Sequence, residues 1–150
     1  MIKKAKINNN KKQRYSLTRV WDLSKPKLLY IMLNPSIADE ENNDPTTRRL
    51  IAFTKKFNYG GFFIVNLFTE ISSNPKTINT SKRITCKNLK VIENLISKAD
   101  KVIYAWGANY DEPNFFKKRI LKPMCFGLNK NGSPKHPLYL KSNTMLKDYR

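Results

Sequence analysis

The chain has 150 residues, which is enough for one domain with its own hydrophobic core and argues against a multi-domain protein. Its 29 lysines and arginines against 11 acidic residues give a formal net charge of +18, and a positive field of that size attracts polyanions. Two distant cysteines, Cys86 and Cys125, and a single histidine cannot assemble a structural zinc site or a cysteine-ligated iron–sulfur cluster, so we expect no metal and no organic cofactor.

The charge excess makes nucleic acid the leading class of partner, with an anionic membrane surface second. The alternative is that a lysine- and asparagine-rich composition only reflects an AT-rich genome. No apolar stretch reaches the length of a signal peptide or of a membrane-spanning helix. We therefore expect a cytoplasmic protein that has no membrane partner.

The N-terminal part of the chain carries little apolar sequence. Residues 1–13 combine five lysines with no acidic residue, which predicts a basic flexible tail ahead of a single domain over residues 14–150. Residues 14–21 alternate polar and apolar side chains, the period of a half-buried edge strand or an extended lead-in.

Four short apolar runs follow, and each is typical of a strand buried on both faces of a parallel sheet. They cover residues 28–33, 62–65, 102–106 and 124–128. Asp44 followed by Pro45 is the start signal of a helix that continues to about Phe57, and residues 81–98 and 113–121 predict two more helices. Strands that alternate with helices predict an α/β fold, a three-layer α/β/α sandwich with a four-stranded, mainly parallel sheet.

The residues directly after the apolar runs are the candidates for a site, because ligands of an open parallel sheet bind beyond the carboxyl ends of its strands. The first run ends in Asn34-Pro35-Ser36 and the second in Asn66. The third ends in Gly107, and the fourth leads through a proline- and glycine-containing loop to His136. Two carboxamides, a glycine bend and the only histidine are therefore predicted to meet on one rim.

Each of these residues also has a purely structural interpretation. Asn-Pro is a common strand-ending turn, which would account for Asn34. A buried Asn66 must find partners, and nearby backbone could supply them. His136, in a loop rich in proline and glycine, could be exposed and idle, and Trp106 and Tyr104 more often fill a core than stack on a base.

Four segments together resemble, in order, the motifs of the uracil-DNA glycosylase superfamily. Met-Leu-Asn-Pro-Ser at 32–36 resembles the first motif in its mismatch-specific form, Gly-Ile-Asn-Pro-Gly, and Ile-Val-Asn-Leu-Phe-Thr at 64–69 resembles the strand that reads the base. Val-Ile-Tyr-Ala-Trp-Gly-Ala at 102–108 resembles the Leu-Leu-Trp-Gly strand, and His-Pro-Leu-Tyr-Leu at 136–140 resembles the second motif, His-Pro-Ser-Pro-Leu.

The chain is more similar still to an uncharacterised bacterial and phage family of domains of unknown function. That family is typified by Met-Leu-Asn-Pro-Ser-x-Ala-Asp, Asp-Pro-Thr-x-Arg-Arg and His-Pro-Leu-Tyr, and all three patterns occur here, starting at Met32, Asp44 and His136. The family itself resembles a divergent branch of the glycosylase superfamily.

The resemblance to the glycosylases implies a role for each polar rim residue. Asn66 would pair with the edge of a pyrimidine, since an amide offers both a donor and an acceptor. His136 would donate to the base oxygen on which negative charge collects as the glycosidic bond breaks. Asn34 would hold the attacking water, and because an amide cannot act as a base at neutral pH, catalysis would rest on positioning and charge stabilisation.

The remaining positions implied by the resemblance are apolar or small. The residues that would line the base pocket are Pro35, Ser36, Gly107 and one of two candidate stacking aromatics, Phe53 or Phe68. Leu138 or Leu140 would be the wedge that enters the base stack. Ser36 stands where the uracil-specific branch has a tyrosine, so the resemblance does not predict that uracil is the accepted base. Leu138-Tyr139 replaces the Ser-Pro that pinches the DNA backbone.

We therefore predict a monomeric glycosylase-like enzyme that hydrolyses the N-glycosidic bond of a non-standard or modified pyrimidine flipped out of single- or double-stranded DNA. Two alternatives stay open. One is a non-catalytic nucleic-acid-binding module of the same fold, and the other is a hydrolase of free nucleosides or nucleotides. DNA repair and phage–host conflict are both compatible contexts.

Overall fold

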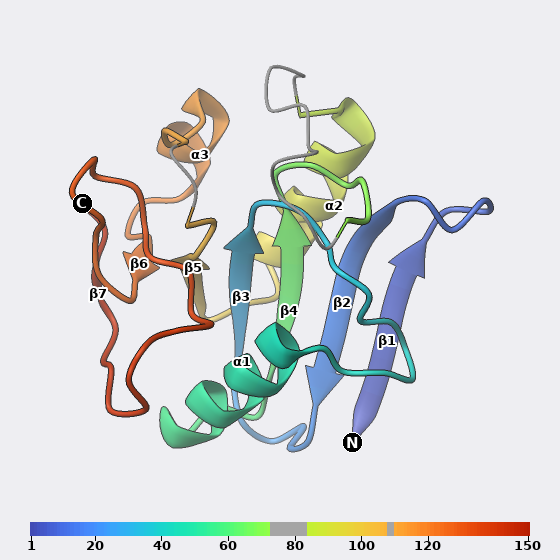
Figure 1. The fold of residues 1–150 in the computed structure, drawn as a ribbon, viewed down its shortest axis with the longest axis horizontal. Coiled ribbons are helices and arrows are strands. Elements are labelled where there is room, and N and C mark those ends of the chain that lie inside the picture. The colour runs from blue at the N-terminus through green and yellow to red at the C-terminus, as the bar shows by residue number, and fades with distance from the viewer. Residues whose placement is uncertain (73–83, 108–109) are drawn as a thin grey trace.

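The computed structural model describes residues 1–72, 84–107 and 110–150 (Figure 1). Its strands form one seven-stranded sheet in the order β1-β2-β4-β3-β5-β6-β7. The strands are β1 (Ile2–Ile7), β2 (Arg14–Val20), β3 (Lys27–Met32), β4 (Gly61–Asn66), β5 (Lys101–Tyr104), β6 (Met124–Cys125) and β7 (Lys147–Asp148). The helices are α1 (Pro45–Lys56), α2 (Cys86–Ile96) and α3 (Asn114–Arg119).

The sheet is mixed. In its centre, β3 pairs in parallel with both β4 and β5, and β5 pairs in parallel with β6. At its sides, β1 with β2, β2 with β4 and β6 with β7 are antiparallel. The prediction of a four-stranded, mainly parallel sheet in a three-layer α/β/α sandwich is therefore wrong, because antiparallel strands extend the sheet on both sides and the described helices are few and short.

Part of the segment that the sequence predicts as a flexible basic tail lies in the sheet. β1 pairs along β2 from Ile2 opposite Val20 to Lys6 opposite Ser16. Only Ala5 and Ile7 of this strand are partly buried. The alternation of buried and exposed side chains is therefore weak, and the lysines make it hard to recognise in the sequence. Lysines on an edge strand also discourage pairing with another chain, which makes them compatible with a strand as well as with a tail.

The core lies on both faces of the sheet. On one face, Tyr30 of β3 and Leu50 of α1 belong to the same buried cluster. On the other, Ile31 of β3 packs in a cluster with Ile92 of α2 and Phe116 of α3. Figure 1 shows α1 in front of the sheet and α2 behind it. Because neighbouring residues of β3 point to opposite faces and those from Leu28 to Met32 are all buried and apolar, the strand has a continuous apolar run.

The predicted helix start at Asp44 and Pro45 is confirmed. The Asp44 side chain accepts a hydrogen bond from the backbone N–H of Thr47 at 2.7 Å, as an N-cap does, and Pro45 is the first helical residue. The second predicted helix begins at Cys86 after the N-cap Thr85, and residues 81–83 of that prediction lie outside the described residues. None of the helices in the described ranges is long and apolar enough to cross a membrane.

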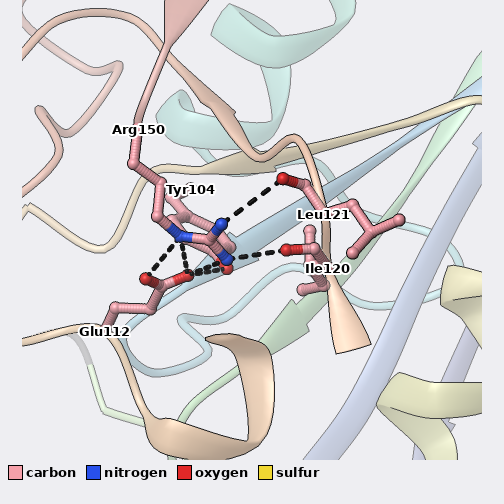
Figure 2. Close-up of polar contacts among 5 residues, drawn as sticks. All are labelled: Tyr104, Glu112, Ile120, Leu121 and Arg150. Carbon is pink, nitrogen blue, oxygen red and sulfur yellow. Dashed lines mark hydrogen bonds and ion pairs between the residues drawn. The ribbon is translucent and has the colours of Figure 1, made fainter. Parts of the chain in front are cut away.

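A buried carboxylate ties the C-terminus to the segment that follows β5 (Figure 2). Glu112 accepts hydrogen bonds from Arg150 Nε at 2.8 Å and from the Tyr104 hydroxyl at 2.5 Å. Arg150 also donates to the backbone carbonyls of Ile120 and Leu121. Burial, with Glu112 beside it, raises the pKa of Tyr104 well above its usual range, so the hydroxyl stays a donor. These bonds fix Glu112 against β5 and against the last residue, Arg150.

Candidate functional site

A cavity of about 550 Å³ lies at the carboxyl ends of β3, β4 and β5. Its walls come from the residues after β3 and β5, the end of β4, the start of β2, the N-terminus of α1 and the loop that contains His136. A volume of this order is typical of small-molecule sites. The principle that ligands bind beyond the carboxyl ends of parallel strands therefore also holds for the parallel centre of this mixed sheet.

The structure brings most of the predicted rim residues together. The predicted residues that line the cavity are Asn34, Ser36, Asn66, Gly107, His136 and Leu138. Pro35, Phe53, Phe68 and Leu140 are not among its lining residues. Phe53 is in the core beneath α1, Phe68 in the core on the opposite face, and Leu140 packs against the α1-side core. Two aromatic residues of the described ranges line the cavity, Trp106, which is buried, and Tyr139, which is exposed.

Asn66 is the least satisfied polar group of the cavity. Its side chain is 1% exposed, and among the described residues neither its Oδ1 nor its Nδ2 has a hydrogen-bond partner. Leaving a buried amide unpaired costs about 1–3 kcal/mol. The structural interpretation, in which nearby backbone satisfies this amide, does not hold within the described part of the chain. An adjacent donor and acceptor are therefore available to a ligand.

Asn88 of α2 fixes the backbone next to Asn66, and sequence reasoning missed it. Its Nδ2 donates to the Asn66 carbonyl at 2.7 Å and to the Leu67 carbonyl at 3.2 Å, so both amide hydrogens go to the end of β4. The signal was present in the helix, because Asn88 lies on the same apolar face as Ile92 and Leu95. A polar residue at a core position of an amphipathic helix indicates a hydrogen bond to a buried group.

His136 is held as a hydrogen-bond donor. Its Nδ1 accepts the backbone N–H of Leu138 at 3.1 Å, so the proton of the neutral imidazole is on Nε2. Burial lowers the pKa of His136, and the nearby Asp44 carboxylate opposes part of that shift. At neutral pH the residue is therefore an uncharged imidazole whose free ring nitrogen is a donor.

Gly107 allows the His136 loop to approach. Its φ is +69°, and a Cβ built on it would lie 2.5 Å from the Cβ of His136. Its N–H donates to the Pro134 carbonyl at 2.9 Å. Both the left-handed backbone and the lack of space require glycine at this position. Gly107 thus acts by positioning His136.

Asn34 has a structural bond and a free acceptor. Its Nδ2 donates to the Ser72 carbonyl at 2.8 Å and to the Pro35 carbonyl at 3.2 Å, while Ser72 N–H donates to the Pro35 carbonyl at 2.9 Å. These bonds fasten the loop after β3 to residues 71–72. Within the described residues the Oδ1 atom of Asn34 makes no hydrogen bond, and it is available to a water or ligand.

Two charged residues of the cavity were not recognised as site residues from the sequence. Arg14 is 3% exposed, donates from Nη1 to the Ala38 carbonyl at 2.6 Å and, among the described residues, leaves Nε unpaired. Burial lowers the pKa of Arg14 to about 10, with Asp44 opposing the shift, so the guanidinium remains charged at neutral pH. Asp44 is 5% exposed and lines the same cavity. Sequence patterns explained Asp44 as a helix cap and Arg14 as a strand residue.

Arg19, which is fully buried, fixes the loop that leads to Asp44. It donates to the Asn43 side chain at 2.8 Å, to the Asn42 carbonyl at 3.1 Å and to the Asp39 carbonyl. Residues 39–43 are thereby tied to β2. Among the described residues, no group of three or more His, Cys, Asp or Glu side chains could hold a metal ion.

The family to which this chain belongs is known. The model of a family described as "Protein of unknown function (DUF1643)" matches residues 14–138, which is most of the chain, and the chain is a member of that family. The matched range begins at Arg14 and ends at Leu138. It therefore contains all the described residues that line the cavity except Tyr139. Comparison with curated proteins finds no match. Comparison with solved structures finds none either.

This match confirms the expected membership in a family of domains of unknown function. The relation of the chain to the uracil-DNA glycosylase superfamily stays a prediction from the motifs.

The unpaired Asn66 amide predicts an unusual effect on stability. Asn66→Leu should not lower the free energy of unfolding, because it removes a polar group that has no partner in the described part of the chain. Asn88→Leu should lower it by about 1–3 kcal/mol, because it deprives two buried carbonyls of their donor. Urea denaturation of both variants and the parent protein measures the difference. If Asn66→Leu lowered the free energy of unfolding as much as Asn88→Leu does, the Asn66 amide would have hydrogen-bond partners in solution.

The contact of Gly107 with His136 predicts a local effect that a matched glycine does not share. Gly107→Ala and Gly132→Ala each place a side chain at positive φ, which costs about 1–2 kcal/mol. Only Gly107→Ala should also displace His136, because no atom of the described residues, apart from the two chain neighbours, lies within 4 Å of the Cβ position at Gly132. The imidazole NMR signals report this directly, since His136 is the only histidine. Unchanged imidazole signals in Gly107→Ala would contradict the packing.

Proposed function

We propose that the protein is a DNA glycosylase that hydrolyses the N-glycosidic bond of a non-standard or modified pyrimidine flipped out of DNA. The observation that carries the proposal is the buried, unpaired amide of Asn66 in the same cavity as the Nε2 donor of His136. An unpaired amide offers a donor and an acceptor side by side, which matches the hydrogen-bonding edge of a nucleobase. Enzymes that act on a base in DNA take that base into such a pocket.

Each cavity residue has a different role in the proposed reaction. Asn66 holds the base edge, and Asn34 Oδ1 holds the attacking water. As the glycosidic bond breaks, its electron pair moves to the base, and His136 Nε2–H donates to the base oxygen that becomes negative. Gly107 keeps His136 in place, and Leu138, which lines the cavity, is the candidate wedge. Trp106 replaces Phe53 and Phe68 as the aromatic candidate for contact with the base.

The charge of the cavity supports an uncharged ligand. Among the described lining residues, Arg14 is positive, Asp44 is negative and His136 is neutral, so the formal charges cancel. A phosphate placed there would meet the Asp44 carboxylate. The chain as a whole, in contrast, carries +18. A neutral base inside and phosphates on a basic exterior suit a polymer substrate better than a free nucleotide.

A second, shallower groove offers phosphate contacts. It has a volume of about 300 Å³ and lies between the β1–β2 edge and α2. Its lysines are Lys6, Lys87 and Lys90, and no acidic residue is among its described lining residues. Lys87 is placed over the Tyr15 ring, with Nζ 4.8 Å from the ring centroid. Clustered lysines of this kind favour DNA as the partner.

The alternative of a non-catalytic nucleic-acid-binding module is favoured by one observation. The Asn34 nitrogen is engaged in fastening the loop after β3, so this residue has a structural role that needs no chemistry. A module of that kind would keep the base pocket and the basic groove but would release no base.

The proposed function predicts base release that depends on cavity residues. Wild-type protein, incubated with duplex and single-stranded oligonucleotides that carry varied pyrimidines, should release one free base, identified by mass spectrometry. His136→Ala should lose on the order of a hundredfold or more in rate. Asn34→Ala should lower the rate with DNA affinity unchanged, and Asn66→Leu should change base preference as well as rate.

Lys135→Ala is the control for these variants, because Lys135 precedes His136 and does not line the cavity. Full activity of all three cavity variants, or no release from any substrate by the wild type, would reject the glycosylase. DNA binding without release would leave the binding module in its place.

The basic groove predicts a change in the salt dependence of DNA binding. A Lys87→Gln, Lys90→Gln double variant should reduce the slope of log affinity against log salt by about 2 for duplex DNA, since each phosphate contact contributes roughly 0.9. Lys117→Gln, Lys118→Gln removes two exposed lysines of α3 that lie outside the groove and should reduce it less. Equal slopes for the two double variants would mean that the groove is no preferred phosphate site.

A further inference from the structure

We propose that Asp44 is a catalytic residue of this cavity, the carboxylate that accepts a proton from the attacking water while His136 donates to the leaving base. This inference rests on the proposed glycosylase function and adds a residue to it. The sequence motifs place an amide, Asn34, at the water, and an amide cannot accept a proton at neutral pH. Among the described residues that line the cavity, Asp44 is the only carboxylate.

The hydrogen bonding of Asp44 leaves one oxygen for this task. Oδ1 accepts the Thr47 N–H at 2.7 Å as the cap of α1. Within the described residues Oδ2 makes no hydrogen bond, although the residue is 5% exposed and lines the cavity. The capping bond fixes the carboxylate, and the second oxygen is free to bind water.

The surroundings of Asp44 stabilise a negative charge. It lies at the N-terminus of a 12-residue helix, where the backbone dipoles favour an anion. Arg14 and Arg19 of β2 interact with it electrostatically, as does His136 of the opposite loop. The unpaired Asn66 amide in the same cavity is independent evidence that a ligand binds there.

The proton balance of the reaction is complete with these groups. The water oxygen forms a bond to the anomeric carbon of the sugar, one water proton moves to Asp44 Oδ2, and the other stays on the new hydroxyl group. The bond between the anomeric carbon and the base nitrogen breaks, and its electron pair leaves with the base. His136 Nε2–H stabilises the base anion, which then takes up a proton from solvent, while Asp44 releases its proton to solvent and becomes a carboxylate again. The products are a free base and an abasic sugar.

Asp44→Asn separates this role from helix capping, because asparagine is as good an N-cap as aspartate and keeps an oxygen for Thr47. Glu41→Gln is the matched control, since Glu41 is exposed, lies in the same loop and loses the same charge. We expect Asp44→Asn to lower the rate of base release by about a hundredfold or more with unchanged DNA affinity, measured at a temperature at which the variant is folded. Glu41→Gln should match the wild type. If Asp44→Asn melts lower, Asp44→Ser supplies a second capped variant without a carboxylate.

NMR titration of His136 gives a readout that does not depend on activity. The pKa of His136 should fall further in Asp44→Asn than in Glu41→Gln, because Asp44 is the charge that opposes the effect of burial. Equal His136 pKa values in the two variants would overturn the placement of Asp44. Full base release by Asp44→Asn would overturn the inference and leave the glycosylase standing. A wild type that releases no base from any substrate would instead reject the proposed function, and the role of Asp44 with it.

Discussion

The parallel pairing of β3 with β4 on one side and β5 on the other is the constraint on which the cavity depends. Met32, the last residue of β3, lies opposite Asn66, the last residue of β4, so both strands end at one edge of the sheet. Backbone hydrogen bonds extend this register past the strands, from Leu67 N–H to the Met32 carbonyl and from Ala105 N–H to the Ile31 carbonyl, both at 2.9 Å. Residues at the ends of β3, β4 and β5, which are distant in the sequence, therefore lie close together. The same register fixes where the loops that follow these strands begin.

The antiparallel strand β2 supplies the buried arginines that hold the loop after β3. It carries Arg14 and Arg19, whose guanidinium groups bind the loop after β3 and so lead the chain to Asp44 at the start of α1. Burial lowers the pKa of both arginines, and Asp44 partly offsets the effect. The result is a cavity whose described lining holds one positive charge, Arg14, and one negative charge, Asp44, inside a chain that is strongly basic overall. Under the proposed function, this separation of charge would place phosphates on the outside and a neutral ring inside.

The elements that the sequence predicts well are those whose pattern reflects burial. The runs at 28–33 and 62–65 became β3 and β4, because strands buried on both faces are apolar throughout. β1 and β7 were missed, since most of their side chains are exposed and backbone pairing leaves no signature in such residues. Among site residues, the strand-end position was enough to find Asn34, Asn66 and His136. Arg14 and Asp44 were missed because pattern reasoning assigns charged residues to the surface or to a cap, and burial of a charge depends on tertiary partners.

The unpaired amide at the end of β4 links the energetics of the fold to the proposed chemistry. Asn88 does not relieve it: both of its amide hydrogens are bonded to the carbonyls of Asn66 and Leu67, and among the described residues its own Oδ1 is also without a partner. These bonds hold the strand end still, and with it the orientation of the Asn66 side chain. A reaction that relies on placement rather than on a metal gains most from polar groups that need no reorganisation when the ligand arrives. In the proposed function, the free energy lost by burying an unsatisfied donor and acceptor is recovered only when a ligand with a matching edge binds. The same residue that weakens the empty protein would then make the pocket selective.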